Sequence, residues 1–198
     1  RFGAHLPVVY LPGAAGDVST RFTRRDQTPG EAERLGRVVG HSVATAVAEG
    51  APVHAPGIDV TRRRFTARVR TSFADAESAD PRAEHASAAG GRVAQSRADG
   101  RHSRAAFEAA DLPATMEIET TDVRIGDRRW LHAPFELASS LGQRLTADDP
   151  GLRYVGYADG YAGYLVDAAT AHDGHYEAFA SLFDLAETER IVRRLDRA

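Results

Sequence analysis

The sequence contains 198 residues and carries a formal net charge of −3, so it suits a single domain and gives no polyanion-binding signature that would indicate nucleic acid. It contains no cysteine, which excludes disulfides, thiolate metal ligands and cysteine nucleophiles. No apolar run approaches the roughly 20 residues of a membrane span. The sequence predicts no particular cellular compartment. Residues 1–3 resemble neither a translation start nor a signal peptide, so we expect the chain to be part of a longer protein.

An apolar run at residues 6–11 predicts a short strand that is buried on both faces. It leads into Gly13-Ala14-Ala15-Gly16-Asp17-Val18-Ser19, whose small residues let another group approach the main chain closely. Three interpretations of this turn stay open: a tight connection, a phosphate cradle, and a loop that presents Ser19 as a nucleophile. The cradle would lack the Walker spacing and its lysine, because the sequence contains no lysine.

A helix is expected from Pro29 to Gly50, because Thr28 and Glu31 form a capping box at its start. Its valines and Leu35 recur at helical spacing, which predicts an apolar face packed in the core. His41 is expected at the edge of that face and not as a metal ligand. Alternation over residues 64–73 then predicts a half-buried strand with an arginine-rich outer face.

The segment 74–112 is rich in alanine and predicts weak helices or a mobile excursion, with His85 and His102 as bystanders. A hairpin follows, with strands at 116–121 and 128–132 around a turn near Gly126.

The last third of the chain alternates short helices, strands and glycine-rich loops. A helix after Glu136, with leucines every four residues, is expected to stop before residue 148. A strand at 152–157 opens into a loop at 158–164, and residues 175–178 are expected in a second loop. Asp184 then caps a last amphipathic helix.

Four segments of the chain, in this order, resemble the neutral/alkaline (non-lysosomal) ceramidase family. They are Gly13–Ser19, Pro134–Glu136 with Gly142–Leu145, Gly160–Tyr164, and Tyr176. The family usually has proline where this chain has Thr20, and glycine where it has Phe135. The resemblance implies an α/β fold, a mixed β-sheet covered by helices. Residues 1–198 would form the C-terminal part of a catalytic domain, incomplete by itself and matched most loosely at 74–112.

The resemblance also assigns roles to four side chains. Ser19 would be the nucleophile, Glu136 and Tyr164 would bind a catalytic zinc ion, and Tyr176 would donate a hydrogen bond to the reacting carbonyl. Taken singly, Glu136 could equally be an acid at a helix N-terminus, and the tyrosines could be packed aromatics. The family's two histidine ligands lie upstream of the matched region, and His5 matches neither. We therefore expect an upstream segment of the same protein to complete the zinc site, and the chain alone to bind zinc weakly.

The function implied by the resemblance is zinc-dependent hydrolysis of the amide bond of ceramide, or of a related N-acyl lipid, to a long-chain base and a fatty acid. The substrate would be reached at a membrane surface. The alternative is a non-catalytic fragment or degenerate homologue that binds a lipid or a protein partner. A serine hydrolase that needs no zinc is a third interpretation, for which the sequence shows no clear Ser–His–Asp order.

Overall fold

The structure is a computed structural model that describes residues 8–50, 57–71, 88–147 and 149–197. Its helices and strands are η1 (Thr20–Phe22), α1 (Pro29–Glu49), β1 (Ile58–Arg68), α2 (Ala88–Ala109), β2 (Thr115–Ile125), β3 (Arg128–His132), β4 (Glu136–Leu137), α3 (Ser139–Ala147), β5 (Leu152–Val155), β6 (Tyr164–Leu165), α4 (Ala168–His172), α5 (Tyr176–Phe179) and α6 (Leu185–Asp196). None of the described helices is long and apolar enough to cross a bilayer.

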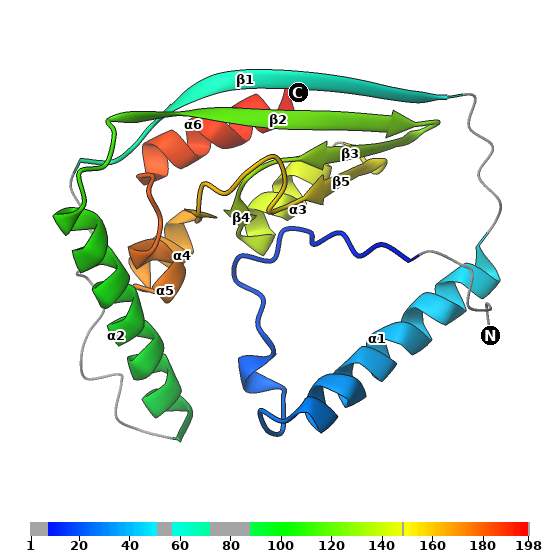
Figure 1. Ribbon diagram of the computed structural model, residues 1–198, viewed down its shortest axis with the longest axis horizontal. Coiled ribbons are helices and arrows are strands. Elements are labelled where there is room, and N and C mark those ends of the chain that lie inside the picture. Colours follow the sequence, from blue (N-terminus) through cyan, green and yellow to red (C-terminus); the bar gives the residue numbers. More distant parts are fainter. Residues whose placement is uncertain (1–7, 51–56, 72–87, 148, 198) are drawn as a thin grey trace.

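Two sheets organise the chain. The larger has the strand order β1-β2-β3-β5, and β4 pairs with β6 in a separate two-stranded sheet. The pairs β1–β2 and β2–β3 are antiparallel, whereas β3–β5 is parallel. Helix α6 lies beneath β1 and β2, and α3 lies beside the shorter strands (Figure 1). The expected α/β class with a mixed sheet and covering helices is therefore confirmed.

The predicted hairpin is present as β2 and β3, and its turn contains Gly126 at φ 61°. The strand predicted at 64–73 begins earlier and covers Ile58–Arg68. Its inner face is nevertheless as expected, because Ala67 and Val69 are buried. Residues 72 and 73 lie outside the described part.

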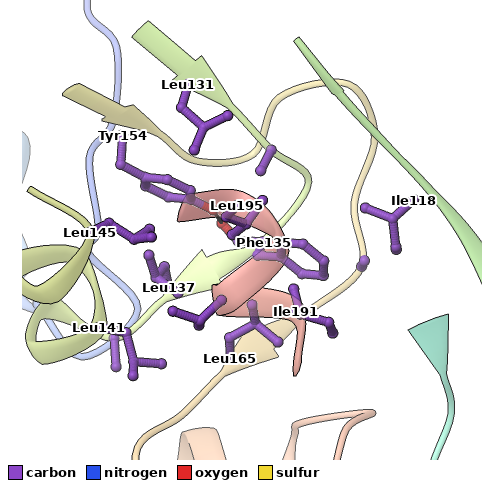
Figure 2. Close-up of a cluster of buried hydrophobic side chains, with 14 of the residues drawn as sticks. Ile118, Leu131, Phe135, Leu137, Leu141, Leu145, Tyr154, Leu165, Ile191 and Leu195 are labelled. Atoms are coloured by element: carbon purple, nitrogen blue, oxygen red, sulfur yellow. Dashed lines mark hydrogen bonds between the residues drawn. The ribbon is translucent and has the colours of Figure 1, made fainter. Parts of the chain in front are cut away.

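The core lies between the sheet and helices α3 and α6 (Figure 2). Its largest fully buried apolar side chains are Phe135, Phe183, Ile118, Leu131, Leu137, Leu141, Leu152, Leu165, Ile191 and Leu195. Phe135 and Phe183 meet edge to face with their ring centroids 5.8 Å apart. Complete burial of one such side chain contributes roughly 1.5–3 kcal/mol. Because Phe135 and Leu137 flank Glu136, this packing fixes the position of β4.

The buried strand predicted at 6–11 is wrong for the residues that the structure describes. Residues 8–11 form no strand, and Val8 and Val9 are 78% and 79% exposed. The reason is that this segment has no sheet partner among the described residues. The main chain first joins the domain at Pro12, whose carbonyl accepts a hydrogen bond from the N–H of Gly156 at 2.9 Å.

The helix predicted at 29–50 is confirmed as α1, but its expected burial is wrong. The Thr28 hydroxyl accepts a hydrogen bond from the Glu31 N–H at 3.3 Å, as a capping residue should. The apolar face is exposed because α1 stands away from the sheet (Figure 1). Its exposed valines are Val38, Val39, Val43 and Val47. His41 is exposed too, with Nδ1 2.7 Å from the Arg37 carbonyl oxygen.

The alanine-rich segment contains one continuous helix, α2, so the helical alternative holds for residues 88–109. Gly100 lets α2 approach α5, since an added Cβ would lie 2.9 Å from Cδ2 of Phe179. His102 on this helix is exposed, whereas His85 lies outside the described residues.

Near the C-terminus the secondary structure differs in two places from the expectation. The helix expected directly after Glu136 begins at Ser139, because residues 136–137 form β4 instead. Residues 176–179 form the short helix α5 and not a loop. The last helix is as predicted, with the Asp184 carboxylate accepting from the Glu187 N–H at 2.6 Å.

Candidate functional site

Glu136 lies in the two-stranded parallel sheet, directly opposite Tyr164. Its N–H donates to the Gly163 carbonyl at 2.9 Å, and the next contact of the ladder runs from the Ala138 N–H to the Leu165 carbonyl at 3.0 Å. With Phe135 and Leu137 completely buried on either side, the Glu136 side chain is held in one direction.

Two tyrosine hydroxyls donate hydrogen bonds to the Glu136 carboxylate, and a third tyrosine, Tyr164, pairs with Glu136 across the small sheet. Tyr157 donates to Oε2 at 2.7 Å and Tyr161 donates to Oε1 at 2.5 Å. Burial and the nearby Glu136 carboxylate both raise the pKa of Tyr164. An ionised carboxylate offers about four acceptor positions, so it can hold both donors at once.

The loop that carries these tyrosines has an unusual backbone. Tyr157 and Asp159 have φ values of 56° and 61°, in the left-handed region that side chains other than glycine rarely adopt. Such a conformation costs of order 1–3 kcal/mol and often occurs at functional sites. Hydrogen bonds hold it in place on both sides, from the Ala158 N–H to the Ala133 carbonyl at 3.1 Å and from the Ala162 N–H to the Pro134 carbonyl.

The surroundings keep these phenols protonated. Burial, with the hydrogen bond to Glu136 as the next cause, raises the pKa of Tyr157 to about 12. The same two causes raise the pKa of Tyr161 and of Tyr164 well above the ordinary value for a phenol. All three hydroxyls therefore act as hydrogen-bond donors at neutral pH.

The turn that carries Ser19 is docked against this sheet. Gly16 donates its N–H to the Leu137 carbonyl at 2.9 Å. A Cβ at Gly16 would lie 2.7 Å from the Glu136 carbonyl oxygen, so only glycine fits there. The Asp17 carboxylate accepts hydrogen bonds from the Ser139 N–H at 2.8 Å and the Ser139 hydroxyl at 2.7 Å, at the start of α3. The turn is thus attached at both β4 and α3.

Ser19 itself is exposed and precedes η1 as its N-cap. Its Oγ accepts a hydrogen bond from the Arg21 N–H at 3.1 Å. Ser19 and Tyr176 line one cavity of about 270 Å³, together with His175. The cavity lies between the Ser19 turn, helix α2 and the start of α5.

The four side chains assigned from the sequence are partly brought together. Tyr176 packs edge to face on Tyr164, with ring centroids 5.9 Å apart at 90°, and Tyr164 in turn pairs with Glu136 between β6 and β4. Ser19 joins this group only through the cavity that it shares with Tyr176. Among the described residues, Ser19 makes no hydrogen bond to Glu136, Tyr164 or Tyr176.

The structure adds three residues that sequence reasoning did not assign. Tyr157 and Tyr161 bind the Glu136 carboxylate, and their rings stack with centroids 6.3 Å apart. His175 lines the Ser19 cavity, and its Nε2 lies 3.9 Å from an Asp173 carboxylate oxygen. The sequence feature that points to Tyr157 and Tyr161 is the concentration of tyrosines in the last quarter of the chain.

The donors present do not make up a zinc site. The Glu136 carboxylate is a ligand type that zinc accepts, but the Tyr164 phenol keeps its proton in this structure, and a catalytic zinc takes three protein ligands. In the part of the chain that the structure describes, no group of three or more histidine, cysteine, aspartate or glutamate side chains could hold a metal ion. The described residues therefore do not complete a zinc site.

No protein-family model matches the sequence, and no curated protein matches it. The solved structures that match this chain include two ceramidases. The neutral ceramidase from Pseudomonas aeruginosa has a TM-score of 0.49 and 16% sequence identity over 86% of this chain and 34% of its own. A ceramidase complexed with C2 has a TM-score of 0.33 and 21% identity over 42% of this chain and 14% of its own. The chain thus spans about a third of the length of the first structure.

Proposed function

We propose that the chain carries part of an amidase site that hydrolyses ceramide, or a related N-acyl lipid, to a long-chain base and a fatty acid. The observation that carries the proposal is the contiguous set of Glu136, Tyr164 and Tyr176, which borders the cavity lined by Ser19. The resemblance of the four sequence motifs to neutral ceramidases supports the choice of substrate.

The proposed nucleophile is the Ser19 hydroxyl. Its oxygen accepts from a backbone N–H, so its own proton stays available for transfer to a base. Attack on the amide carbon would form a tetrahedral intermediate with negative charge on the former carbonyl oxygen. Tyr176, on the same cavity, would donate a hydrogen bond to that oxygen. Loss of one such donor typically costs about 10²–10³-fold in rate.

The proposal names residues of this chain that would bind zinc, and it assigns no catalytic step to the ion. Glu136 and Tyr164 are the two oxygen donors that this chain would offer to the ion, and the two histidines implied by the resemblance are not matched in it. The described residues do not complete that site, so no step above is assigned to the metal. Within this chain, Glu136 positions the hydroxyls of Tyr157 and Tyr161.

The test is release of fatty acid from a fluorescent N-acyl sphingosine, with and without added zinc. The enzyme is used as the 198-residue chain and as the longest open reading frame that contains it. Ser19→Ala should reduce turnover to background, because no other hydroxyl is assigned to attack. Ser42→Ala is the matched control, since Ser42 is exposed on α1 and bonds only its own helix at Val38. Full turnover in Ser19→Ala would overturn the assignment of Ser19 as the nucleophile.

A second candidate function is lipid binding without turnover. The exposed apolar side chains at the start of the described chain favour it, because Val8, Val9 and Tyr10 are each more than three-quarters exposed. Lipid binding without turnover is supported if neither form of the protein releases fatty acid while both sediment with ceramide-containing vesicles.

A further inference from the structure

A cavity far along the chain from Ser19 has a strongly basic lining. It has a volume of about 450 Å³, and its lining residues come from α6 and from strands β1 and β2. The residues that line it are Arg63, Arg64, Phe65, Thr120, Arg190, Arg193, Arg194 and Arg197. Neither the proposed amidase chemistry nor the sequence resemblance uses any of them.

Two of these arginines are already neutralised by carboxylates. Arg64 donates to Glu119 at 2.6 Å, and Arg190 binds Glu187 through Nε at 2.8 Å. Arg193 interacts electrostatically with Glu189 and helps to lower the pKa of that carboxyl, after Arg144. The guanidinium groups of Arg63, Arg194 and Arg197 have no carboxylate of a described residue within ion-pair distance. The cavity therefore carries excess positive charge.

The guanidinium groups are held on both walls of the cavity. Arg194 on α6 lies over the ring of Phe65 on β1, with its Cζ 5.4 Å from the ring centroid. Arg63 on β1 donates through Nη1 to the Arg197 carbonyl at the end of α6, at 2.7 Å. These contacts order two long side chains before any ligand arrives, which lowers the entropic cost of binding.

The helix dipole explains only part of this arrangement. Arg193 and Arg194 lie in the last turn of α6, where positive side chains are stabilised by the negative end of the helix. Arg63 comes from the strand opposite, so the dipole does not account for its presence. Like charges that share one cavity repel each other, and a bound anion removes that cost.

We propose that this cavity binds the phosphate group of an organic phosphate. The planar fork of a guanidinium matches two phosphate oxygens, which makes arginine a preferred phosphate ligand. The volume of about 450 Å³ falls in the range of small-molecule sites, roughly 300–1,000 Å³. The Phe65 ring supplies an apolar wall for the organic part of the ligand.

The test is binding of glycerol 3-phosphate and inorganic phosphate by calorimetry, and of vesicles by sedimentation. The vesicles contain either phosphatidylcholine alone or phosphatidylcholine with phosphatidylglycerol. The double variant Arg63→Gln with Arg194→Gln should weaken binding at least about tenfold, since a hydrogen bond to a charged group is worth about 1.5–3 kcal/mol. Arg62→Gln, one residue away on the opposite face of β1, removes an equal charge and should leave binding unchanged.

The outcomes separate the two sources of phosphate. Binding of the soluble phosphates identifies a free small molecule, whereas binding of phosphatidylglycerol vesicles alone identifies a lipid headgroup. The proposal is overturned if neither binds, or if Arg62→Gln weakens binding as much as the double variant does. Should circular dichroism show that the double variant is unfolded, Arg197→Gln replaces it, because the carbonyl that binds Arg63 stays in place.

Discussion

Glu136 and Tyr164 are Cα partners in the parallel pair of β4 and β6, and burial together with Glu136 raises the pKa of the Tyr164 hydroxyl. Their juxtaposition is therefore fixed by a backbone ladder and not by a loop alone. Tyr157 and Tyr161 reach the same carboxylate from a loop with a strained backbone. The Glu136 carboxylate therefore orders the tyrosine loop, and the pairing of β4 with β6 fixes the position of Glu136.

Replacement of Glu136 by alanine should loosen the tyrosine loop. The variant removes the acceptor of Tyr157 and Tyr161, and because both hydroxyls are partly exposed we expect a loss of about 1 kcal/mol in the free energy of unfolding. Urea denaturation measures the loss, and amide exchange should become faster at residues 157–163. Glu117→Ala, at an exposed position of β2, should change stability by less than about 0.5 kcal/mol. Equal effects of the two variants would contradict the role given to Glu136.

Gly16→Ala should destabilise the protein and displace the Ser19 turn. The new Cβ would lie 2.7 Å from the Glu136 carbonyl oxygen, a backbone atom that cannot move without disturbing β4. The matched control is Gly40→Ala in the middle of α1, where nothing lies within 4 Å of the added atom. That change should stabilise α1 by up to about 1 kcal/mol through helix propensity. Thermal unfolding of both variants should show shifts of opposite sign.

The tyrosine cluster should ionise late in an alkaline titration. The pKa of Tyr157 is raised to about 12, above the ordinary value of about 10. A raised folded-state pKa means that the cluster contributes stability below pH 10 and loses it as the pH rises through about 12. Tyrosinate absorbance measured against pH should therefore rise in two stages. In Tyr157→Phe the rise in absorbance at the higher pH should be smaller. A single rise near pH 10 in the native protein would contradict the raised pKa of the tyrosine cluster.

Glu187→Gln should be strongly destabilising. The Glu187 side chain is 1% exposed, and its carboxylate accepts from the Arg68 N–H at 2.9 Å and from Arg190. The partner side chains of Arg68 and Arg190 are 67% and 33% exposed, so the change leaves no buried unpaired charge, and we expect a loss of about 1.5–3 kcal/mol. Urea denaturation of Glu189→Gln, which breaks the exposed pair with Arg144, should show at most about 1 kcal/mol.

The same residue should make stability sensitive to acid. Burial alone would raise the pKa of Glu187, but hydrogen bonds from Arg190 and from the Arg68 N–H outweigh it and lower the pKa overall. A lowered pKa contributes stability above the ordinary range of a glutamate and loses it as the pH falls through the folded value. The acid side of the stability profile should therefore be flatter in Glu187→Gln than in the native protein.

Local signals predicted those parts of the fold that depend on local contacts. Thr28 and Asp184 accept the capping hydrogen bonds that their positions suggested. Gly126 forms the expected turn, and the alternation around Ala67 identified the inner face of β1. Each of these features is decided within a few residues of sequence, by capping, by turn geometry or by periodicity.

The remainder depends on contacts between distant segments. The apolar run at residues 8–11 has the composition of a buried strand, yet burial needs a partner strand, which composition does not reveal. The helix was expected to begin directly after Glu136, because nothing in this neighbourhood shows that β6 will pair with residues 136–137. Tyr157 and Tyr161 were missed for a similar reason, since a left-handed backbone at Tyr157 turns their hydroxyls toward Glu136.

The parallel pairing of β4 with β6 also determines when the site forms during folding. A parallel pair cannot close through a hairpin, because the chain must first make a crossover. Here the crossover contains α3 and β5, whose leucines belong to the core. Closing this long-range contact costs chain entropy. Burial of those leucines has to offset that cost before β4 can pair with β6. We therefore expect the site to form late in folding, after the core that contains these leucines.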